Sequence, residues 1–383
     1  MSGPLNGIRI LDLTTMMLGP YATQMLGDMG AEVIKVESPE GDPIRQVGPS
    51  RSAGMSGIFM NLGRNKKSVV FDLKKPAEQE ALLALAETCD VFVHNMRLAA
   101  IERLGLSYAA VRQRRPDIVY AAAYGFGQTG PYADRPAYDD TIQAMTGLAH
   151  AQAAFSGAPM YQATIPADKT VAVYFATSIV AALFHRQRTG EGQSVEVSMF
   201  ETMSGWMLAE NLYGATFEPA LSEPVYPRVV APERRPYKTL DGYIAVVAYS
   251  DRQWLRLFES AGRGHLLQDP RFANVAARTT HVSALYGAVA EICAERTTEE
   301  CLRVFAAADV PVVRVMSTAD LLHDEHLEKV GFFSLFDHPS EGRIRHVASP
   351  FRFSGSALGT PSGAPRLGEH TAEVLAQMPD QIA

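Results

Sequence analysis

The chain has 383 residues, of which 47% are hydrophobic and 20% are charged, and this balance excludes a disordered or collagen-like protein. The 42 acidic residues outnumber the 35 Lys and Arg residues, so the net charge of −7 gives no overall attraction to nucleic acid, and we expect no nucleic-acid partner. The three cysteines show no CxxC spacing, which disfavours a disulfide framework and a zinc ribbon. We therefore expect reduced thiols and no metal site.

Short apolar runs alternate with helical segments through the first half of the chain. Residues 8–13 are typical of a buried strand, and residues 20–27 are typical of a helix with Pro20 in its first turn. Such alternation predicts βαβ units and a mostly parallel sheet covered by helices. Further strands are expected at 31–36, 69–73, 91–94, 118–124 and 194–199, and further helices at 76–88, 99–104 and 169–188.

The pattern changes near residue 218. Residues 218–235 contain four prolines and are typical of an extended connector. A hairpin around Asp241-Gly242 follows. Helices are expected at 252–261, 281–295, 299–307 and 369–378, with strand-like runs on both sides of Gly342. A larger α/β domain and a smaller α+β domain are the expected division.

No membrane segment is expected. The most apolar stretch, residues 171–184, is too short to cross a bilayer and is typical of a buried core helix. The first residues lack the basic and apolar segments of a signal peptide. We expect a cytoplasmic protein with no membrane partner.

A glycine motif follows the strand at 118–124. Gly125, Gly127 and Gly130 match G-x-G-x-x-G, but the dinucleotide-binding motif requires a helix to begin at once. Pro131 and Pro136 follow instead, so a nicotinamide dehydrogenase is disfavoured. We interpret residues 125–130 as an active-site loop that lets the backbone approach a ligand.

Asp168 lies at the start of the long apolar helix and has two interpretations. It is a favoured N-cap residue type, and it is also a carboxylate that free helix N–H groups would keep ionised and able to attack an activated acyl group. The residues alone leave both open. Arg64, Lys66 and Lys67 open the expected third strand and are candidates for binding phosphate.

Several segments together resemble the class III CoA-transferase family, which includes formyl-CoA transferase and carnitine CoA-transferase. They are residues 5–12, 19–20, 26–37, 65–68, 72–74, 125–132, 143–147, 188–193 and 367–371. The resemblance implies a Rossmann-like large domain with a parallel sheet over residues 1–217, completed by 345–383, a connector and small α+β domain over residues 218–344, and an interlocked homodimer.

The resemblance also implies a function and a site. The activity would be CoA transfer from an acyl-CoA thioester to a carboxylic acid through an aspartyl anhydride and an aspartyl-CoA thioester, with no permanently bound cofactor. Asp168 would be the nucleophile. Asp140 is expected to assist it, and Asp139 is the alternative. The residues expected to line the CoA site are Leu18, Lys67, Phe71, Asp72, Leu73, Lys74, Asn95, Met96, Arg97 and Arg103.

Two other functions remain open from the sequence. Racemases of the same fold pair a histidine with the aspartate, but the position of that histidine is occupied by Tyr138, a poor base near neutral pH. The other alternative is an acyl-CoA-binding protein without turnover. Arg45, Arg51 and Arg228 are candidates for binding the second carboxylate of a dicarboxylic acid, or are ordinary surface arginines.

Overall fold

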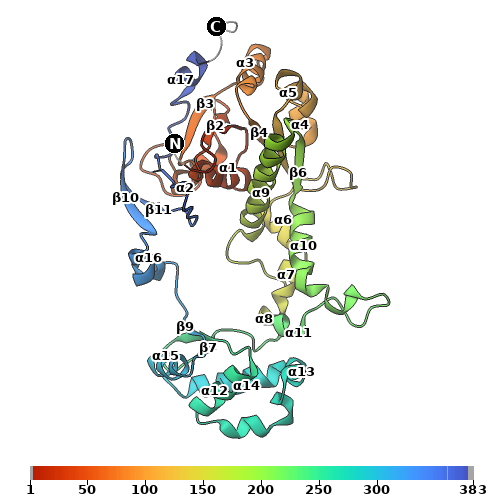
Figure 1. Ribbon diagram of the computed structural model, residues 1–383, viewed down its shortest axis with the longest axis vertical. Coiled ribbons are helices and arrows are strands. Elements are labelled where there is room, and N and C mark those ends of the chain that lie inside the picture. The colour runs from red at the N-terminus through yellow and green to blue at the C-terminus, as the bar shows by residue number, and fades with distance from the viewer. Residues whose placement is uncertain (1–2, 360, 378–383) are drawn as a thin grey trace. The chain divides into compact units, whose positions relative to one another are not determined.

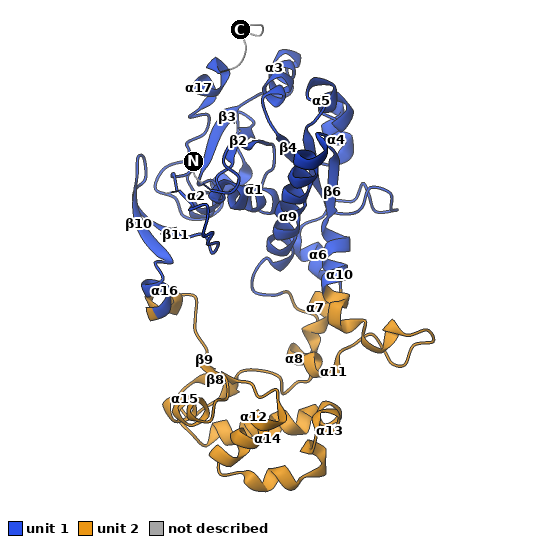
Figure 2. Cartoon of the chain, in the orientation of Figure 1, with its two compact units in different colours: residues 1–146, 162–206, 326–383 blue, residues 147–161, 207–325 orange. Residues whose placement is uncertain are grey.

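The computed structural model describes residues 3–359 and 361–377. The described chain forms two compact units, which Figure 2 shows in different colours. Unit 1 comprises residues 1–146, 162–206 and 326–383, and unit 2 comprises residues 147–161 and 207–325. The boundary expected from the sequence, 217/218, lies eleven residues after the division at 206/207.

A six-stranded parallel sheet is the centre of unit 1 (Figure 1), so the expected α/β class is confirmed. The strand order is β3-β2-β1-β4-β5-β6, in which β1 and β4 are neighbours although two strands separate them in sequence. The register places Leu11 of β1 between Ile34 of β2 and Phe92 of β4. The strands are β1 Arg9–Asp12, β2 Glu32–Glu37, β3 Lys66–Val70, β4 Val91–His94, β5 Val119–Tyr124 and β6 Ser194–Ser198.

Apolar residues from alternate positions of these strands cover one face of the sheet. Leu11, Ile34, Phe92 and Tyr120 belong to one buried cluster with side chains from the helices on that face. This burial is the main favourable term in the folding of unit 1. The helices that contribute are α3 Pro76–Glu87, α4 Leu98–Arg103, α5 Tyr108–Arg114 and α17 Thr371–Ala376.

Two helices that pack against each other lie next to the sheet as well: α1 Leu18–Asp28 and α9 Pro166–Thr189, with α9 also contacting β5 and β6. Helix α9 begins at Pro166, whose missing N–H is not needed in a first turn, and ends at Gly190, whose φ of 77° suits glycine. By length and composition α9 could cross a membrane, yet in the structure its inner side is buried against unit 1. It therefore serves as a core helix, as expected.

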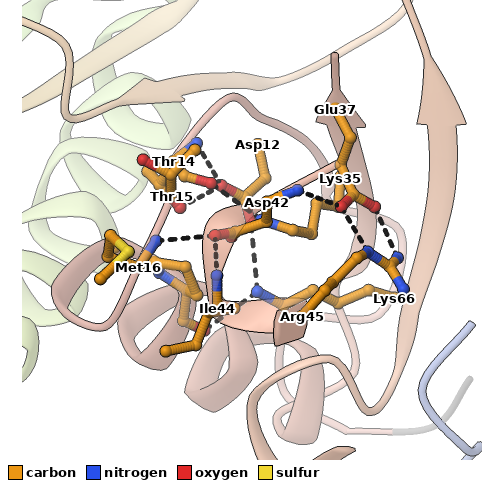
Figure 3. Close-up of polar contacts among 12 residues, drawn as sticks. Asp12, Thr14, Thr15, Met16, Lys35, Glu37, Asp42, Ile44, Arg45 and Lys66 are labelled. Atoms are coloured by element: carbon orange, nitrogen blue, oxygen red, sulfur yellow. Dashed lines mark hydrogen bonds and ion pairs between the residues drawn. The ribbon is translucent and has the colours of Figure 1, made fainter. Parts of the chain in front are cut away.

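Buried charged side chains lie beneath the loop that joins β1 to α1 (Figure 3). The Asp12 carboxylate accepts hydrogen bonds from the hydroxyls of Thr14 and Thr23 and forms an ion pair with Lys66 at 3.1 Å. The Lys35 ammonium lies 2.8 Å from the Asp42 carboxylate. Each buried charge therefore has an opposite charge beside it, as burial of an ion requires.

The end of the described chain covers the open edge of the sheet. Strand β3 has a strand neighbour on one side only. On its other side, the Ser68 carbonyl accepts from the His370 N–H at 2.9 Å, and the Val70 N–H donates to the Thr371 hydroxyl at 3.1 Å. Residues 362–373 therefore cover the edge of β3 at which no further strand pairs. The remaining elements of unit 1 are α2 Gly57–Leu62, α6 Asp139–Met145, the first half of α10 Met199–Asn211, and the antiparallel pair β10 Phe333–His338 and β11 Gly342–Val347.

Unit 2 has its own core, in which helices pack on a small antiparallel sheet of order β7-β8-β9. Trp254, Phe258, Tyr286 and Phe305 are among its buried aromatic residues. Its strands are β7 Tyr237–Lys238, β8 Tyr243–Val246 and β9 Val312–Arg314. Its helices are α7 Leu148–Ala151, α8 Ala153–Ser156, α11 Pro227–Val230, α12 Asp251–Ser260, α13 Val275–Thr280, α14 Val282–Ala294 and α15 Thr298–Ala307, and α16 Glu325–Lys329 lies at the boundary with unit 1.

Candidate active site

A cavity of about 270 Å³ opens at the carboxyl ends of β1, β4 and β5. In parallel sheets of this strand order, ligands bind where the chain connections diverge, which is between β1 and β4. The lining residues all belong to unit 1: Thr15, Met16, Met17, Leu18, Asn95, Arg97, Ala123, Tyr124, Gly125, Ala133, Arg135, Pro136, Ala137, Tyr138, Asp168 and Met199.

Asp168 lines this cavity but does not cap its helix. It is the third residue of α9, and the N-cap residue, Ile165, makes no side-chain cap. The Asp168 N–H instead donates to the carboxylate of Asp139 at 3.0 Å. The capping interpretation of Asp168 is therefore wrong: Asp139 caps the helix, and the Asp168 carboxylate is left for other chemistry.

Burial and, to a smaller extent, the nearby negative charge of Asp139 together raise the pKa of Asp168 to about 7. This contradicts the expectation that free helix N–H groups would keep the group ionised. The physical reason is that loss of solvent around the carboxylate, together with the negative charge of Asp139, disfavours its ionised form. Near neutral pH the carboxylate is thus poorly solvated and basic, which are properties of a reactive group.

Asp139 is fixed by a chain of hydrogen bonds at the N-terminal end of α9. Its second oxygen accepts from the Gln143 amide at 2.6 Å, and the Gln143 oxygen accepts from the Gln162 N–H at 2.9 Å. Asp139 and Gln143 are both buried, whereas Asp140 is exposed and does not line the cavity. The structure therefore brings Asp139, rather than the expected Asp140, to the nucleophile candidate.

The loop between β1 and α1 is held from three directions. The Asn95 amide, at the end of β4, bonds both the N–H and the carbonyl of Thr15, at 3.0 and 2.9 Å. The Lys35 ammonium donates to the Thr14 carbonyl at 2.8 Å, and the Asp42 carboxylate accepts from the Met16 N–H at 3.1 Å (Figure 3). Met16 is held at a φ of +68°, an uncommon conformation for this residue type. The buried charges therefore shape one wall of the cavity.

The glycine motif forms another wall. No helix follows β5 directly, and residues 125–138 form turns and a loop, as expected. A Cβ at Gly125 would lie 2.4 Å from the Cβ of Ala137, so only glycine fits beside the cavity. The N–H groups of Gly127 and Gln128 donate to Glu201 and Glu196, both at 2.9 Å, which fixes the loop.

The residues expected at the CoA site fall into three groups. Leu18, Asn95 and Arg97 line the cavity, and Met96 lies between the last two in the chain. Lys74 and Arg103 are exposed, and Asp72 and Leu73 are partly exposed. Phe71 is buried in the apolar core, so its ring is not available to a ligand at the surface. Lys67 lies elsewhere, because its ammonium pairs with Glu32 at the start of β2 and with Glu373 of α17.

The basic cluster that opens β3 is structural. Arg64 forms an ion pair with Asp28 at 2.6 Å, and Lys66 is buried against Asp12. Arg45 is likewise buried and donates two hydrogen bonds of 2.7 Å to the Glu37 carboxylate. These arginine and lysine side chains are occupied by protein acids, so the interpretation of Arg64 and Lys66 as phosphate ligands, and of Arg45 as a carboxylate ligand, is wrong.

Arg51 and Arg228, the other candidates for binding a second carboxylate, lie away from the cavity. The Arg51 guanidinium donates to the backbone carbonyls of Glu341 and Arg343 in unit 1. Arg228 lies in unit 2, where it contacts two tyrosine hydroxyls. Neither residue lines the cavity at Asp168.

Sequence reasoning gave no role to Gln143 or to the loop residues Thr15 and Met16. A signal for Gln143 existed: it lies four residues after Asp139 and therefore on the same face of a helix. No comparable signal marks the loop, because its contacts come from strands distant in sequence. Among the described residues, no group of three His, Cys, Asp or Glu side chains is arranged to hold a metal ion.

The whole chain resembles a known family of enzymes. Residues 5–371 match the model of CoA-transferase family III. The chain belongs to CoA-transferase family III. It is therefore a transferase that acts on CoA thioesters, and the resemblance noted in the sequence is confirmed.

Curated relatives match over nearly their full length. The chain is 32% identical to a succinate–glutarate CoA-transferase of Agrobacterium fabrum, with 98% of this chain and 96% of the relative covered. It is also 32% identical to a succinyl-CoA:mesaconate CoA-transferase of Haloarcula hispanica, covering 97% and 96% of the two chains. Among solved structures, a variant of Rv3272 from Mycobacterium tuberculosis superposes with a TM-score of 0.86 at 28% identity, covering 98% of this chain and 99% of that one.

Proposed function

We propose that this enzyme moves CoA from an acyl-CoA thioester to a carboxylic acid, dicarboxylates included, with Asp168 as the covalent nucleophile. The main support is the Asp168 carboxylate itself, which lies partly buried in the wall of a cavity at the switch point of the sheet. The relatives named above, a succinate–glutarate CoA-transferase and a succinyl-CoA:mesaconate CoA-transferase, support a dicarboxylate as donor acid or acceptor.

The reaction is a double displacement in which the energy of the thioester is kept. An Asp168 oxygen attacks the acyl carbonyl, the C–S bond breaks, and an acyl-aspartyl anhydride and CoA thiolate form. The thiolate attacks the Asp168 carbonyl carbon and releases the donor acid, which leaves an aspartyl-CoA thioester. The acceptor carboxylate then reverses both steps, so that acyl-CoA leaves and free Asp168 is restored.

The surroundings of Asp168 suit both halves of this sequence. As a buried carboxylate near Asp139 it is poorly stabilised as a free anion, which favours attack on the thioester. The same enclosure limits access of water, which would hydrolyse the anhydride or the thioester. Asp139 is a positioning residue: it holds the backbone of Asp168 and sets the basicity of its carboxylate.

CoA would approach along the carboxyl edge of the sheet. Leu18, Asn95 and Arg97 lie in the cavity wall, and Lys74 and Arg103 are exposed and available to phosphate groups. We leave Lys67 out of this proposal, since two carboxylates already bind its ammonium. Arg97 and Arg135 both line the cavity and are exposed at the surface.

The cavity gives less support to a racemase. Its lining contains no histidine among the residues that the structure describes, and Tyr138 is a weak base near pH 7. A binding protein without turnover would have no need for a carboxylate held in such an unfavourable setting.

An isotope experiment tests the nucleophile directly. Acceptor acid labelled with ¹⁸O should leave one labelled oxygen in Asp168. The acceptor carboxylate supplies the bridging oxygen of the second anhydride, and this oxygen stays on Asp168 when the thiolate attacks the acyl carbonyl. Mass spectrometry of the peptide containing Asp168 should show a gain of about 2 Da after a single turnover and at most about 4 Da after many, and hydroxylamine should trap the acyl-enzyme at the same residue. Asp168→Asn should abolish both the label and transfer, and label at another carboxylate would overturn the assignment.

We further propose that the enzyme is a cytoplasmic, interlocked homodimer that associates with no membrane. Val173, Tyr174 and Phe184 of α9 are 50–59% exposed, and Trp206 and Leu208 of α10 are also exposed, which supports burial of these surfaces by a second copy. Light scattering should give the dimer mass at all concentrations at which activity is retained. A stable, active monomer would contradict the proposal.

A further inference from the structure

Unit 2 contains a small cavity that plays no part in the proposed chemistry. Its volume is about 90 Å³, and all of its lining residues belong to unit 2. Four aromatic residues and two arginines dominate the lining: Tyr226, Arg228, Tyr249, Trp254, Arg278 and Tyr286. Such a lining can contact both the apolar and the charged part of a small molecule.

The two arginines of this cavity differ in their partners. Arg278 is buried, pairs with the Asp251 carboxylate and donates to the Phe272 carbonyl at 2.8 Å, so its charge is neutralised within the protein. Arg228 is partly buried and donates to the hydroxyls of Tyr286 at 2.8 Å and of Tyr249 at 3.2 Å. Within the described part of the chain, no carboxylate forms an ion pair with Arg228.

The contacts of the Arg228 guanidinium fix its orientation but include no negatively charged group. Its central carbon lies 4.8 Å from the centre of the Tyr249 ring, so aromatic contact and two hydroxyls fix its plane. Hydroxyl groups solvate a cation but do not neutralise it, and a partly buried charge gains most from an opposite charge that also accepts hydrogen bonds. The cavity therefore favours an anion with an oxygen acceptor.

Size and charge narrow the class of anion. The volume of about 90 Å³ suits a small carboxylate such as acetate. One unpaired guanidinium supplies a single positive charge, which matches the single negative charge of a monocarboxylate. The aromatic walls would contact the carbon atoms.

We propose that this cavity binds the carboxylate end of a small organic acid through Arg228. The proposal concerns unit 2 alone and stands whether or not Asp168 is the nucleophile. Tyr249 and Tyr286 are positioning residues for the guanidinium, and Trp254 lies in the cavity wall.

Trp254 gives the site its own signal. The chain has two tryptophans, Trp206 and Trp254, and Trp206 is 43% exposed outside the cavity. In the full-length Trp206→Phe protein, emission therefore reports on Trp254 alone. Titration with acetate should change this emission with saturation, whereas chloride at equal ionic strength should not.

Matched variants in the same background decide the role of Arg228. Arg228→Gln should weaken acetate binding at least tenfold, and Arg228→Lys, which keeps the charge without the planar fork, should weaken it less. Arg271→Gln, which removes an exposed arginine outside the cavity, should leave binding unchanged.

The variants also separate this site from the chemistry of unit 1. Asp168→Asn should abolish transfer, if the proposed function is right, while leaving the Trp254 response intact. Absence of a saturable response, an equal response to chloride, or an unaltered response in Arg228→Gln would each overturn the proposal. If Arg228→Gln failed to fold, Arg228→Lys and Tyr249→Phe would decide, since each keeps most of the contacts and should still weaken binding.

Discussion

Two aspartates of unit 1, the buried Asp12 and the partly buried Asp168, have opposite surroundings. Burial alone disfavours the charged form of each. Around Asp12, Lys66, Lys35 and two hydroxyls outweigh that effect and hold its pKa below the usual value. Around Asp168 the nearest charge is another carboxylate, and burial with that neighbour raises the pKa to about 7.

The difference separates a carboxylate that supports the fold from one that is available for reaction. Asp12 has no free oxygen for a substrate, because Thr14, Thr23 and Lys66 surround it. It helps to hold the loop that lines the cavity, whereas Asp168 lies in the cavity wall itself. Four changes to these surroundings would test the contrast.

Asp12→Asn should have the largest effect on stability. It leaves the Lys66 ammonium buried without its carboxylate, and breaking such a pair costs about 3–5 kcal/mol of unfolding free energy. Urea denaturation would measure the loss. Glu80→Gln, which removes a half-exposed partner of Arg114, is the control and should cost less than about 1 kcal/mol. Equal losses in both variants would refute the role assigned to Asp12.

Asp168→Asn should change stability in the opposite direction. Since the folded pKa of Asp168 is raised to about 7, the folded state holds a proton that the unfolded state releases above pH 4, and the unfolding free energy falls as pH rises through this window. Asparagine removes that penalty. At pH 8 it should therefore stabilise the protein by at most about 4 kcal/mol, at about 1.4 kcal/mol per pKa unit, and at pH 4 it should have little effect. If the stabilisation by Asp168→Asn did not increase between pH 4 and pH 8, the ionised Asp168 carboxylate would not destabilise the folded state.

The activity of the wild-type enzyme should depend on the same proton. Attack requires the carboxylate, so kcat/KM should rise with pH up to about 7 and then level off. Asp139→Asn removes the neighbouring negative charge and should move this profile to lower pH by about one unit. A profile that does not move would remove Asp139 as a cause of the raised pKa.

A double variant provides the control for Asp139. Asparagine alone would set its NH₂ group against the Gln143 amide, whereas Asp139→Asn with Gln143→Glu restores every acceptor while moving the charge to residue 143. The double variant should recover thermal stability. Its pH profile should lie between those of the single variant and the wild type.

The smallest effects are expected at the exposed cations. Lys74→Ala and Arg103→Ala should each raise the KM for acyl-CoA about fivefold, or about 1 kcal/mol, and added salt should shrink the difference. Lys67→Ala should leave this KM unchanged, because Glu32 and Glu373 bind its ammonium. A raised KM in Lys67→Ala, with unchanged values in Lys74→Ala and Arg103→Ala, would assign Lys67 to the CoA site.

Much of the sheet could be predicted from the sequence because its central strands, β1, β4 and β5, are buried on both faces. The runs at 8–13, 91–94 and 118–124 are mainly apolar, and each contains the strand observed there. Strand β3 was placed three residues too late, because it opens with Lys66 and Lys67. Buried lysines are rare, and only the contact with Asp12, distant in sequence, accounts for Lys66.

The site was less accessible to sequence reasoning. The position of Asp168 at the start of a long helix could be seen, but not that Ile165 would be the N-cap. Asp139 and Asp140 are adjacent and chemically alike, so only the path of the backbone decides which one faces α9. Arg45 likewise looks like any surface arginine until the fold places Glu37 beside it.

The covered edge of strand β3 has a consequence for how the protein is made. The strand is synthesised early, but the residues that shield its open edge, 362–373, leave the ribosome about three hundred residues later. During that interval the nascent sheet presents unpaired N–H and carbonyl groups, which are a template for joining another chain. Meanwhile unit 2, encoded between these segments, emerges and has a core of its own with which to fold. Messages truncated before codon 362 should therefore yield aggregates, and nascent chains should depend on chaperones until the final segment is released.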